Sequence, residues 1–201
     1  AFFDSDFVFK EAVAYYNLKG YGGYHSGDIV DAPNGASEFI DLDLDALVKK
    51  GVRYVVTSLN SFTWQPYCDL PECFAGWMAR ADTASGEVFE PRTVVDRIDI
   101  ASDTSICLPF VMDLVERRMI WADLGLTSSP RWNNVDNNLS GVSLMLRALV
   151  HTPRPDLHTL FDLHVRARGE RVASAEQAQR VFAPEQGLTP FDTDLIRSEY
   201  L

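Results

Sequence analysis

Carboxylates and glycines crowd one short segment near the start of the sequence. The acidic residues are Asp28, Asp31, Glu38, Asp41 and Asp43. Calcium takes about six to eight oxygen ligands, and glycine-containing loops supply backbone carbonyls beside carboxylates. Aspartates that alternate along residues 41–45 repel one another unless water or a cation lies between them. Composition leaves two interpretations open, a calcium site and an ordinary solvated acidic surface.

The tetrapeptide HSGD, residues 25–28, opens this segment. It lies in a loop longer than the roughly two to five residues that join the strands of a simple hairpin. His25 differs from the other histidines because it is embedded among acids, and it could orient the loop by a hydrogen bond. The segment is not an EF-hand, because the Asp-x-Asp-x-Asp-Gly spacing and its terminal glutamate are missing.

Other residue types offer weaker evidence for chemistry. Cys68 and Cys73 have the spacing of half a zinc site, but no second pair or nearby histidine completes it. No nucleophile stands beside a base, and no Gly-x-Ser-x-Gly, P-loop or Gly-x-Gly-x-x-Gly motif is present. The sequence favours a non-enzymatic protein. The alternative is an enzyme with a pocket between a sandwich and C-terminal helices, using His158, His164 and Arg166.

The bulk properties limit the possible partners. The 201 residues carry a formal net charge of −11, which argues against nucleic acid and anionic membranes, because both attract basic surfaces. Three cysteines are too few and too odd in number for a disulfide framework, so a reducing cytoplasm is expected. No apolar run is long enough to insert into a bilayer. The chain opens in what looks like mid-strand, which indicates a fragment preceded by an N-terminal region.

The elements that must position these residues fall into two parts. Residues 1–125 contain seven or eight short strand patterns with frequent turns, the strongest over Val52–Thr57, and predict a mainly β fold, a two-sheet antiparallel β-sandwich. Residues 126–201 change to helical spacing and predict a small α-helical C-terminal subdomain packed on the sandwich. The predicted sandwich core comprises Val55, Phe74, Trp77, Phe110 and Trp121.

Several stretches resemble the TerD-like family of bacterial tellurium-resistance and stress proteins. They are AFFDSDFVF, AYYNL, HSGD and GASEFIDLDL, followed by GVRYVVTSLNSF, FAGWMARADTASGEVF and MIWADLGL. The resemblance covers residues 1 to about 125, and HSGD with its spaced glutamate is the most specific part. Residues 126–201 resemble the extension found behind divergent TerD-like domains in larger bacterial proteins.

The resemblance implies a calcium-binding β-sandwich that acts with protein partners in a membrane-associated tellurite-resistance or stress-response complex. Asp28 matches the aspartate of the family's HSGD, and Glu38 matches the glutamate that closes its acidic run. Carbonyls from Asp31 to Gly35 would add ligands. The family's Gly-Asp-Asp-Glu is Gly-Ala-Ser-Glu here, so two carboxylates are lost and Asp31 compensates for one at most. A weak calcium site and an empty remnant both remain open.

Overall fold

The computed structural model describes residues 1–31, 33, 35–80, 89–126, 138–152, 157–179, 181, 194 and 198, with the backbone alone for Leu157, Leu160 and His164. This part of the chain is mainly β, with several antiparallel sheets and a few short helices. It divides into two compact units, Ala1–His151 and Thr152–Leu201. The prediction placed a boundary near residue 125, where strand patterns give way to helical spacing. The first compact unit extends further and includes the helix Leu139–His151.

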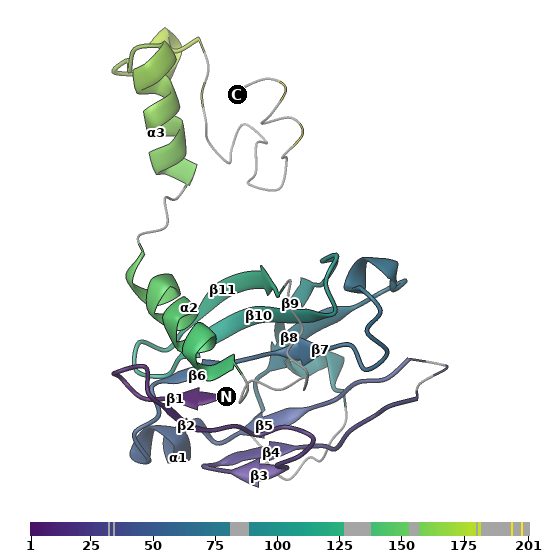
Figure 1. The fold of residues 1–201 in the computed structure, drawn as a ribbon. Helices are drawn as coiled ribbons and strands as arrows, with labels where there is room; N and C mark the ends of the chain where they lie inside the picture. The colour runs from purple at the N-terminus through teal and green to yellow at the C-terminus, as the bar shows by residue number, and fades with distance from the viewer. Residues whose placement is uncertain are drawn as a thin grey trace. The chain divides into compact units, whose positions relative to one another are not determined.

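The largest sheet has the strand order β11-β10-β6-β1-β2, with β7 also paired to β10, and all of its pairings are antiparallel (Figure 1). Its strands are β1 (Phe2–Phe3), β2 (Phe9–Glu11), β6 (Tyr54–Val56), β7 (Leu59–Asn60), β10 (Ile106–Asp113) and β11 (Arg118–Gly125). β10 and β11 form a hairpin that closes with the pair Asp113 and Arg118. The run ICLPFVMDLVERRMIWADL predicts two strands around residues 116–118, and this hairpin confirms them.

The central strands of this main sheet are buried on both faces, since neighbouring side chains point to opposite faces and enter different apolar clusters. Phe2 and Val55 belong to one apolar cluster, and their neighbours Phe3 and Val56 belong to another. β10 is buried along nearly its whole length. A strand covered on both faces carries a continuous apolar run, which accounts for the sequence ICLPFVM at this position.

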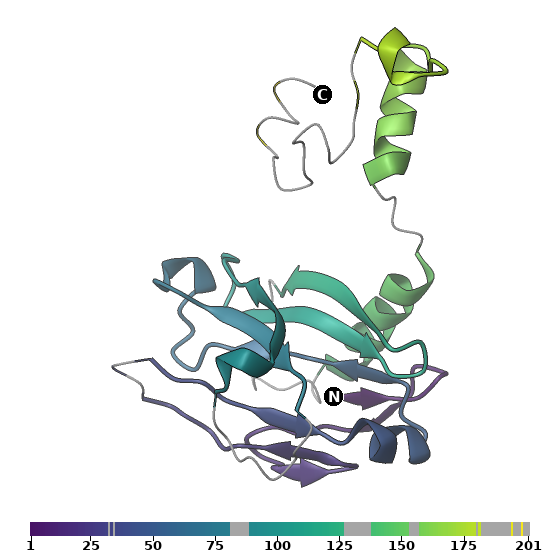
Figure 2. The same cartoon turned by 180° about the vertical axis from the view of Figure 1, so that it is seen from behind.

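Two smaller antiparallel sheets complete the β structure. One contains β3 (Lys19–Gly20), β4 (Gly23–His25) and β5 (Ile40–Leu42), and the other contains β8 (Phe74–Met78) and β9 (Val94–Asp99). The first lies so close to β1 that a Cβ added at Gly23 would be 3.0 Å from the Phe2 ring. The second contacts β10 through the edge-to-face pair of Trp77 and Phe110. Figure 2 shows both from behind.

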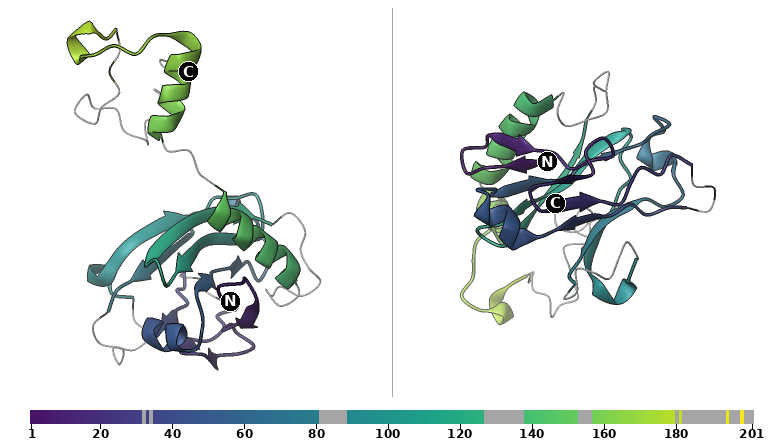
Figure 3. Two further views of the ribbon diagram at one scale, coloured as in Figure 1. Left: turned by 90° about the vertical axis from the view of Figure 1, so that its left-hand side faces the viewer. Right: turned by 90° about the horizontal axis from the view of Figure 1, so that it is seen from below.

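The helices are short, and local sequence sets their ends. In α1 (Leu44–Lys49), the Asp43 carboxylate accepts a hydrogen bond from the Ala46 N–H, and Gly51 follows with φ +82°. α2 (Leu139–His151) packs on the main sheet, seen from the side in Figure 3, and α3 (Leu157–Arg168) belongs to the second unit. Three-residue 3₁₀ turns are η1 (Tyr67–Asp69), η2 (Pro91–Thr93) and η4 (Ala175–Gln177).

The predicted core is correct at Val55 and Phe110 and wrong at two aromatic positions. Phe74 and Trp121 are exposed by 36% and 55%, respectively. Phe74 begins β8 at an exposed position, and the guanidinium of Arg97 lies 4.9 Å from the centre of its ring. Trp121 follows the buried Ile120 on β11, so strand alternation turns its side chain to the opposite face.

Candidate cation-binding loop

The acidic loop joins β4 to β5 and extends beyond the ends of both strands (Figure 1). Ser26 and Phe39 close its base with two hydrogen bonds. The Ser26 N–H donates to the Phe39 carbonyl at 2.9 Å, and the Phe39 N–H donates to Ser26 Oγ at 2.9 Å. The loop therefore leaves the sheet through a fixed neck, and the serine of HSGD is one side of it.

Glu38 is the predicted ligand that the structure positions most firmly. Its Oε1 accepts a hydrogen bond from the Ile29 N–H at 2.6 Å, which links the two arms of the loop. Its Oε2 lies 3.9 Å from His25 Nε2. The side chain of Glu38 is 39% exposed, so the carboxylate borders solvent while it stabilises the loop. This hydrogen bond thus places the Glu38 carboxylate against the backbone of the residue that follows Asp28.

His25 is buried and organises the start of the loop. Its Nδ1 accepts a hydrogen bond from the Gly27 N–H at 3.0 Å, so the proton of the neutral ring is on Nε2 and faces Glu38. Gly27 has φ +124°, which glycine tolerates and other residues rarely adopt. His25 thus orients the loop as the acceptor of a backbone N–H, whereas the sequence suggested a hydrogen bond to a carbonyl or carboxylate.

The remaining predicted ligands are exposed. Asp28, Asp31 and Gly35 lie on the outer part of the loop, and Gly35 has φ +83°. The carbonyls predicted as ligands at positions 32 and 34 fall outside the described residues. Within the described part, no three side chains of histidine, cysteine, aspartate or glutamate are grouped closely enough to hold a metal ion. Asp28, Asp31 and Glu38 therefore form an acidic loop without a preformed three-carboxylate cluster.

The aspartates after the loop have other positions and roles. Asp41 pairs with Tyr24 in the ladder between β5 and β4. Asp43 caps α1, and Asp45 lies in the first turn of that helix, where negative charge interacts favourably with the helix dipole. The acidic run that looked like a cation cluster in sequence is thus divided between a strand and a helix start.

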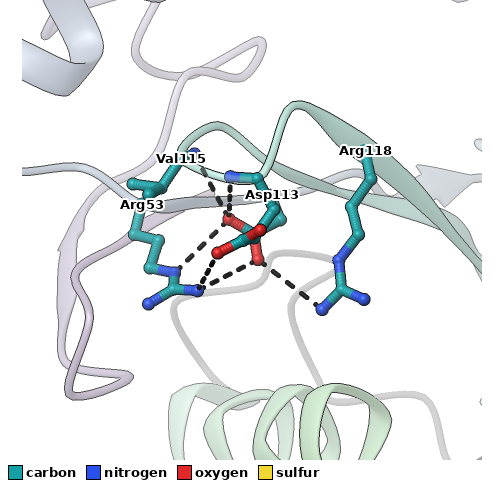
Figure 4. Close-up of polar contacts among 5 residues, drawn as sticks. Arg53, Asp113, Val115 and Arg118 are labelled. Carbon is teal, nitrogen blue, oxygen red and sulfur yellow. Dashed lines mark hydrogen bonds and ion pairs between the residues drawn. The ribbon is translucent and has the colours of Figure 1, made fainter.

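A second charged cluster, which sequence reasoning missed, surrounds Asp113 at the end of β10 (Figure 4). The Asp113 carboxylate is buried, and Arg53 donates to both of its oxygens at 3.3 Å. The N–H groups of Val115 and Glu116 donate to Oδ1 at 3.2 Å, and Arg118 lies 3.7 Å from Oδ2. These contacts satisfy the carboxylate and fasten the β10–β11 hairpin to β6. The arrangement is structural, since the buried Asp113 carboxylate is neutralised by two arginines of the same chain.

The cysteines are spread over different environments. Cys68 is exposed, Cys73 is partly buried and Cys107 is buried. Burial, followed by the nearby Cys73, raises the pKa of Cys107 to about 12, and burial also raises the pKa of Cys73. Both therefore remain thiols at neutral pH.

The groups of the alternative enzymatic site lie on α3. His158 is exposed, and the side chain of His164 is outside the described part of the chain. Arg166 contacts Asp162 at 2.8 Å, and Arg171 contacts the same carboxylate at 2.6 Å. This pairing stabilises the helix end and its following turn. This helix belongs to the second compact unit, and the pocket between it and the sheets stays a prediction.

No helix among the described residues combines the length and the apolar composition needed to cross a membrane. Comparison with known proteins found no matching family model, no matching curated protein and no matching solved structure.

Proposed function

We propose that this chain is a non-enzymatic, TerD-like β-sandwich domain whose loop between β4 and β5 binds calcium weakly. The packing of two sheets supports the sandwich. Phe2 and Val55 of the main sheet share an apolar cluster with Leu42 of β5 and Tyr21, which precedes β4. The opposite face of the main sheet carries Val142 and Leu146 of α2, which supports a helical extension packed on the sandwich.

The observation that carries the calcium proposal is the closed neck of the acidic loop. Ser26 and Phe39 fix its base, and Glu38 links its two arms through the Ile29 N–H. Asp28 and Asp31 lie on the exposed outer part of the loop, where a cation from solvent can reach them. Hard oxygen donors favour calcium, whereas zinc prefers nitrogen and sulfur. Two exposed carboxylates and a glutamate already engaged with the backbone provide little charge, so affinity is expected at the weak end of calcium sites.

The cellular role proposed here is that of a scaffold or interaction module in bacterial tellurite resistance or stress response, in the cytoplasm. The residues that support it are those of the TerD-like resemblance, HSGD and the spaced Glu38 above all. The net charge of −11 supports protein partners and not nucleic acid or direct insertion into a membrane.

Calorimetric titration of calcium into chelator-treated protein tests the loop. We expect weak binding and a calcium-dependent rise in melting temperature, because a ligand that binds only the native state stabilises it. Asp28→Asn should abolish this rise while barely changing the protein without calcium. Asp123→Asn is the matched control, since it removes one exposed carboxylate from β11 at φ +43°, a conformation that asparagine tolerates.

The outcomes separate three situations. Loss of the calcium effect in Asp28→Asn alone supports the loop site. Equal loss in Asp28→Asn and Asp123→Asn would indicate nonspecific screening of the acidic surface. If saturating calcium leaves the melting temperature of the wild-type protein unchanged and produces no binding heat, the calcium proposal is wrong. The loop is then a protein-contact edge or a remnant of a site.

A further inference from the structure

Two aromatic side chains project from a short turn after β7, here called the aromatic turn (residues 61–65). Phe62 is 63% exposed and Trp64 is 48% exposed. Large aromatic side chains are usually mostly buried, whereas this one turn holds two that expose about half or more of their surface. The turn precedes η1, which lies at the edge of the first unit opposite α2 in Figure 1. It is separate in sequence from the acidic loop of residues 26–39.

The backbone holds the aromatic turn rigidly. The Trp64 N–H donates to the Ser61 carbonyl at 3.2 Å, and the Ser61 N–H donates to Ser105 at 2.8 Å. After the turn, the N–H groups of Tyr67 and Cys68 donate to the carbonyls of residues 104 and 102 at 3.1 and 2.9 Å. The Tyr67 side chain is buried and anchors this side. Both ends of the turn are thus fastened to the segment 102–105, which leads into β10.

Trp64 has φ +63°, a left-handed conformation that is unfavourable for a residue with a large side chain. The surrounding hydrogen bonds maintain it. A rigid turn has little conformational entropy to lose when its rings are covered, which favours binding by a preorganised surface.

The charge around the turn is negative. Residues 54–79 contain Asp69 and Glu72 but no lysine or arginine, and residues 98–112 of the neighbouring segment contain Asp99 and Asp103 with the same lack of basic residues. Arg97 contacts Glu72 at 3.6 Å and Asp99 at 3.1 Å. Asp69 and Asp103 belong to the two segments that the backbone hydrogen bonds join, so their charge lies near the exposed rings.

We propose that the aromatic turn docks a lysine- and arginine-rich segment of a partner protein. Cations bind favourably over the faces of tryptophan and phenylalanine, and carboxylates beside the rings add Coulomb attraction. The same chemistry occurs within this fold, where Arg97 lies 4.9 Å from the centre of the Phe74 ring. This surface does not depend on calcium binding by the acidic loop. The negative charge disfavours the alternative of an anionic membrane surface.

Fluorescence anisotropy with a labelled octa-arginine peptide tests the proposal, with chelator present so that the acidic loop holds no calcium. The variant Phe62→Ala/Trp64→Gly removes both rings, and glycine accepts the φ of position 64 without strain. We expect it to weaken binding by at least about tenfold, within the range of an aromatic anchor contact. Tyr15→Ala/Tyr16→Ala is the matched control, because it removes another exposed aromatic pair, 46% and 41% exposed. This control should change affinity by less than about twofold.

A second variant tests the charge contribution independently of the rings. Asp69→Asn/Asp103→Asn should weaken octa-arginine binding and reduce its dependence on salt concentration, and an octa-glutamate peptide should not bind. Equal binding by the wild-type protein and the ring variant would overturn the proposal, as would equal losses in the ring variant and the tyrosine control. Binding to neutral phosphatidylcholine vesicles that requires Phe62 and Trp64, without peptide binding, would overturn it in favour of a membrane contact.

Discussion

The Asp113 cluster permits a quantitative prediction about how the main sheet is held together. The Asp113 side chain has 0% exposure, and Arg53 retains 27%. Hydrogen bonding to Asp113 raises the pKa of Arg53, so its guanidinium stays charged. Removing one partner of a buried ion pair costs about 3–5 kcal/mol, because it leaves the other charge uncompensated. Arg53 can recover part of its hydration through its exposed portion, which reduces the penalty.

Asp113→Asn retains an oxygen that can accept the N–H groups of Val115 and Glu116, so it mainly removes the charge. We expect a loss of about 2–3 kcal/mol in the free energy of unfolding, near the value of one or two charge-assisted hydrogen bonds. Asp113→Ala also removes the acceptor for both N–H groups, which should add about 1 kcal/mol, the typical value of a lost capping interaction. In a chain of this size, the asparagine variant should melt roughly 4–12 °C below the wild-type protein.

Urea unfolding of the wild-type protein and these variants measures the effect, with an unchanged m value as the sign that the same surface is exposed. Glu116→Gln is the control, since its 58% exposed carboxylate lies 3.8 Å from the same arginine and should contribute less than about 0.5 kcal/mol. A loss in Asp113→Asn no larger than in Glu116→Gln would refute the reasoning. The burial of the Asp113 charge would then contribute nothing beyond a surface ion pair.

Two further predictions concern other parts of the first unit. Leu146→Ala should lower the free energy of unfolding in urea by about 2–5 kcal/mol, because Leu146 of α2 has 0% exposure in the cluster on the main sheet. Leu144→Ala is the control, since Leu144 is 69% exposed and its loss should cost below about 0.5 kcal/mol. A loss in Leu146→Ala as small as in this control would contradict the packing. Asp4→Asn should lower the melting temperature at neutral pH. Burial of the Asp4 carboxyl raises its pKa, but hydrogen bonds from Lys10, Val8 and Asp6 outweigh this effect and lower the pKa below 3.8 overall. Its stabilisation is therefore complete above pH 3.8 and lost as the pH falls through the lowered pKa, so the variant and wild-type melting temperatures should converge in acid, and a difference that persists there would contradict this origin.

Local sequence signals predicted elements well where the pattern was strong and the partners were close in sequence. The β-branched segment around Val55 is β6, and the periodic apolar residues of 139–151 form α2. The run LDALVKKG also predicts the short helix α1, because a glycine that stops a helix is a local signal. These elements need only neighbouring residues to specify them.

The predictions failed where a distant contact decides the environment of a side chain. Phe74 is an aromatic residue of the kind expected in a core, but it is exposed and its ring contacts the guanidinium of Arg97 on the neighbouring strand. Asp113 resembles an ordinary turn residue in MDLVERR, and the arginine that neutralises it lies 60 positions earlier. Pairing across sheets depends on register and topology, which single-sequence periodicity does not encode.

The acidic segment shows how the backbone changes the meaning of a charge pattern. In the sequence, the carboxylates from Asp28 to Asp43 look equivalent as possible ligands. In the structure, Glu38 accepts the Ile29 N–H and Asp43 accepts the Ala46 N–H, so each already has a role that needs no metal. The calcium proposal consequently depends on Asp28 and Asp31. The number of acids therefore does not separate a cation site from an acidic segment that stabilises its own fold. The backbone hydrogen bonds that each carboxylate accepts separate the two better.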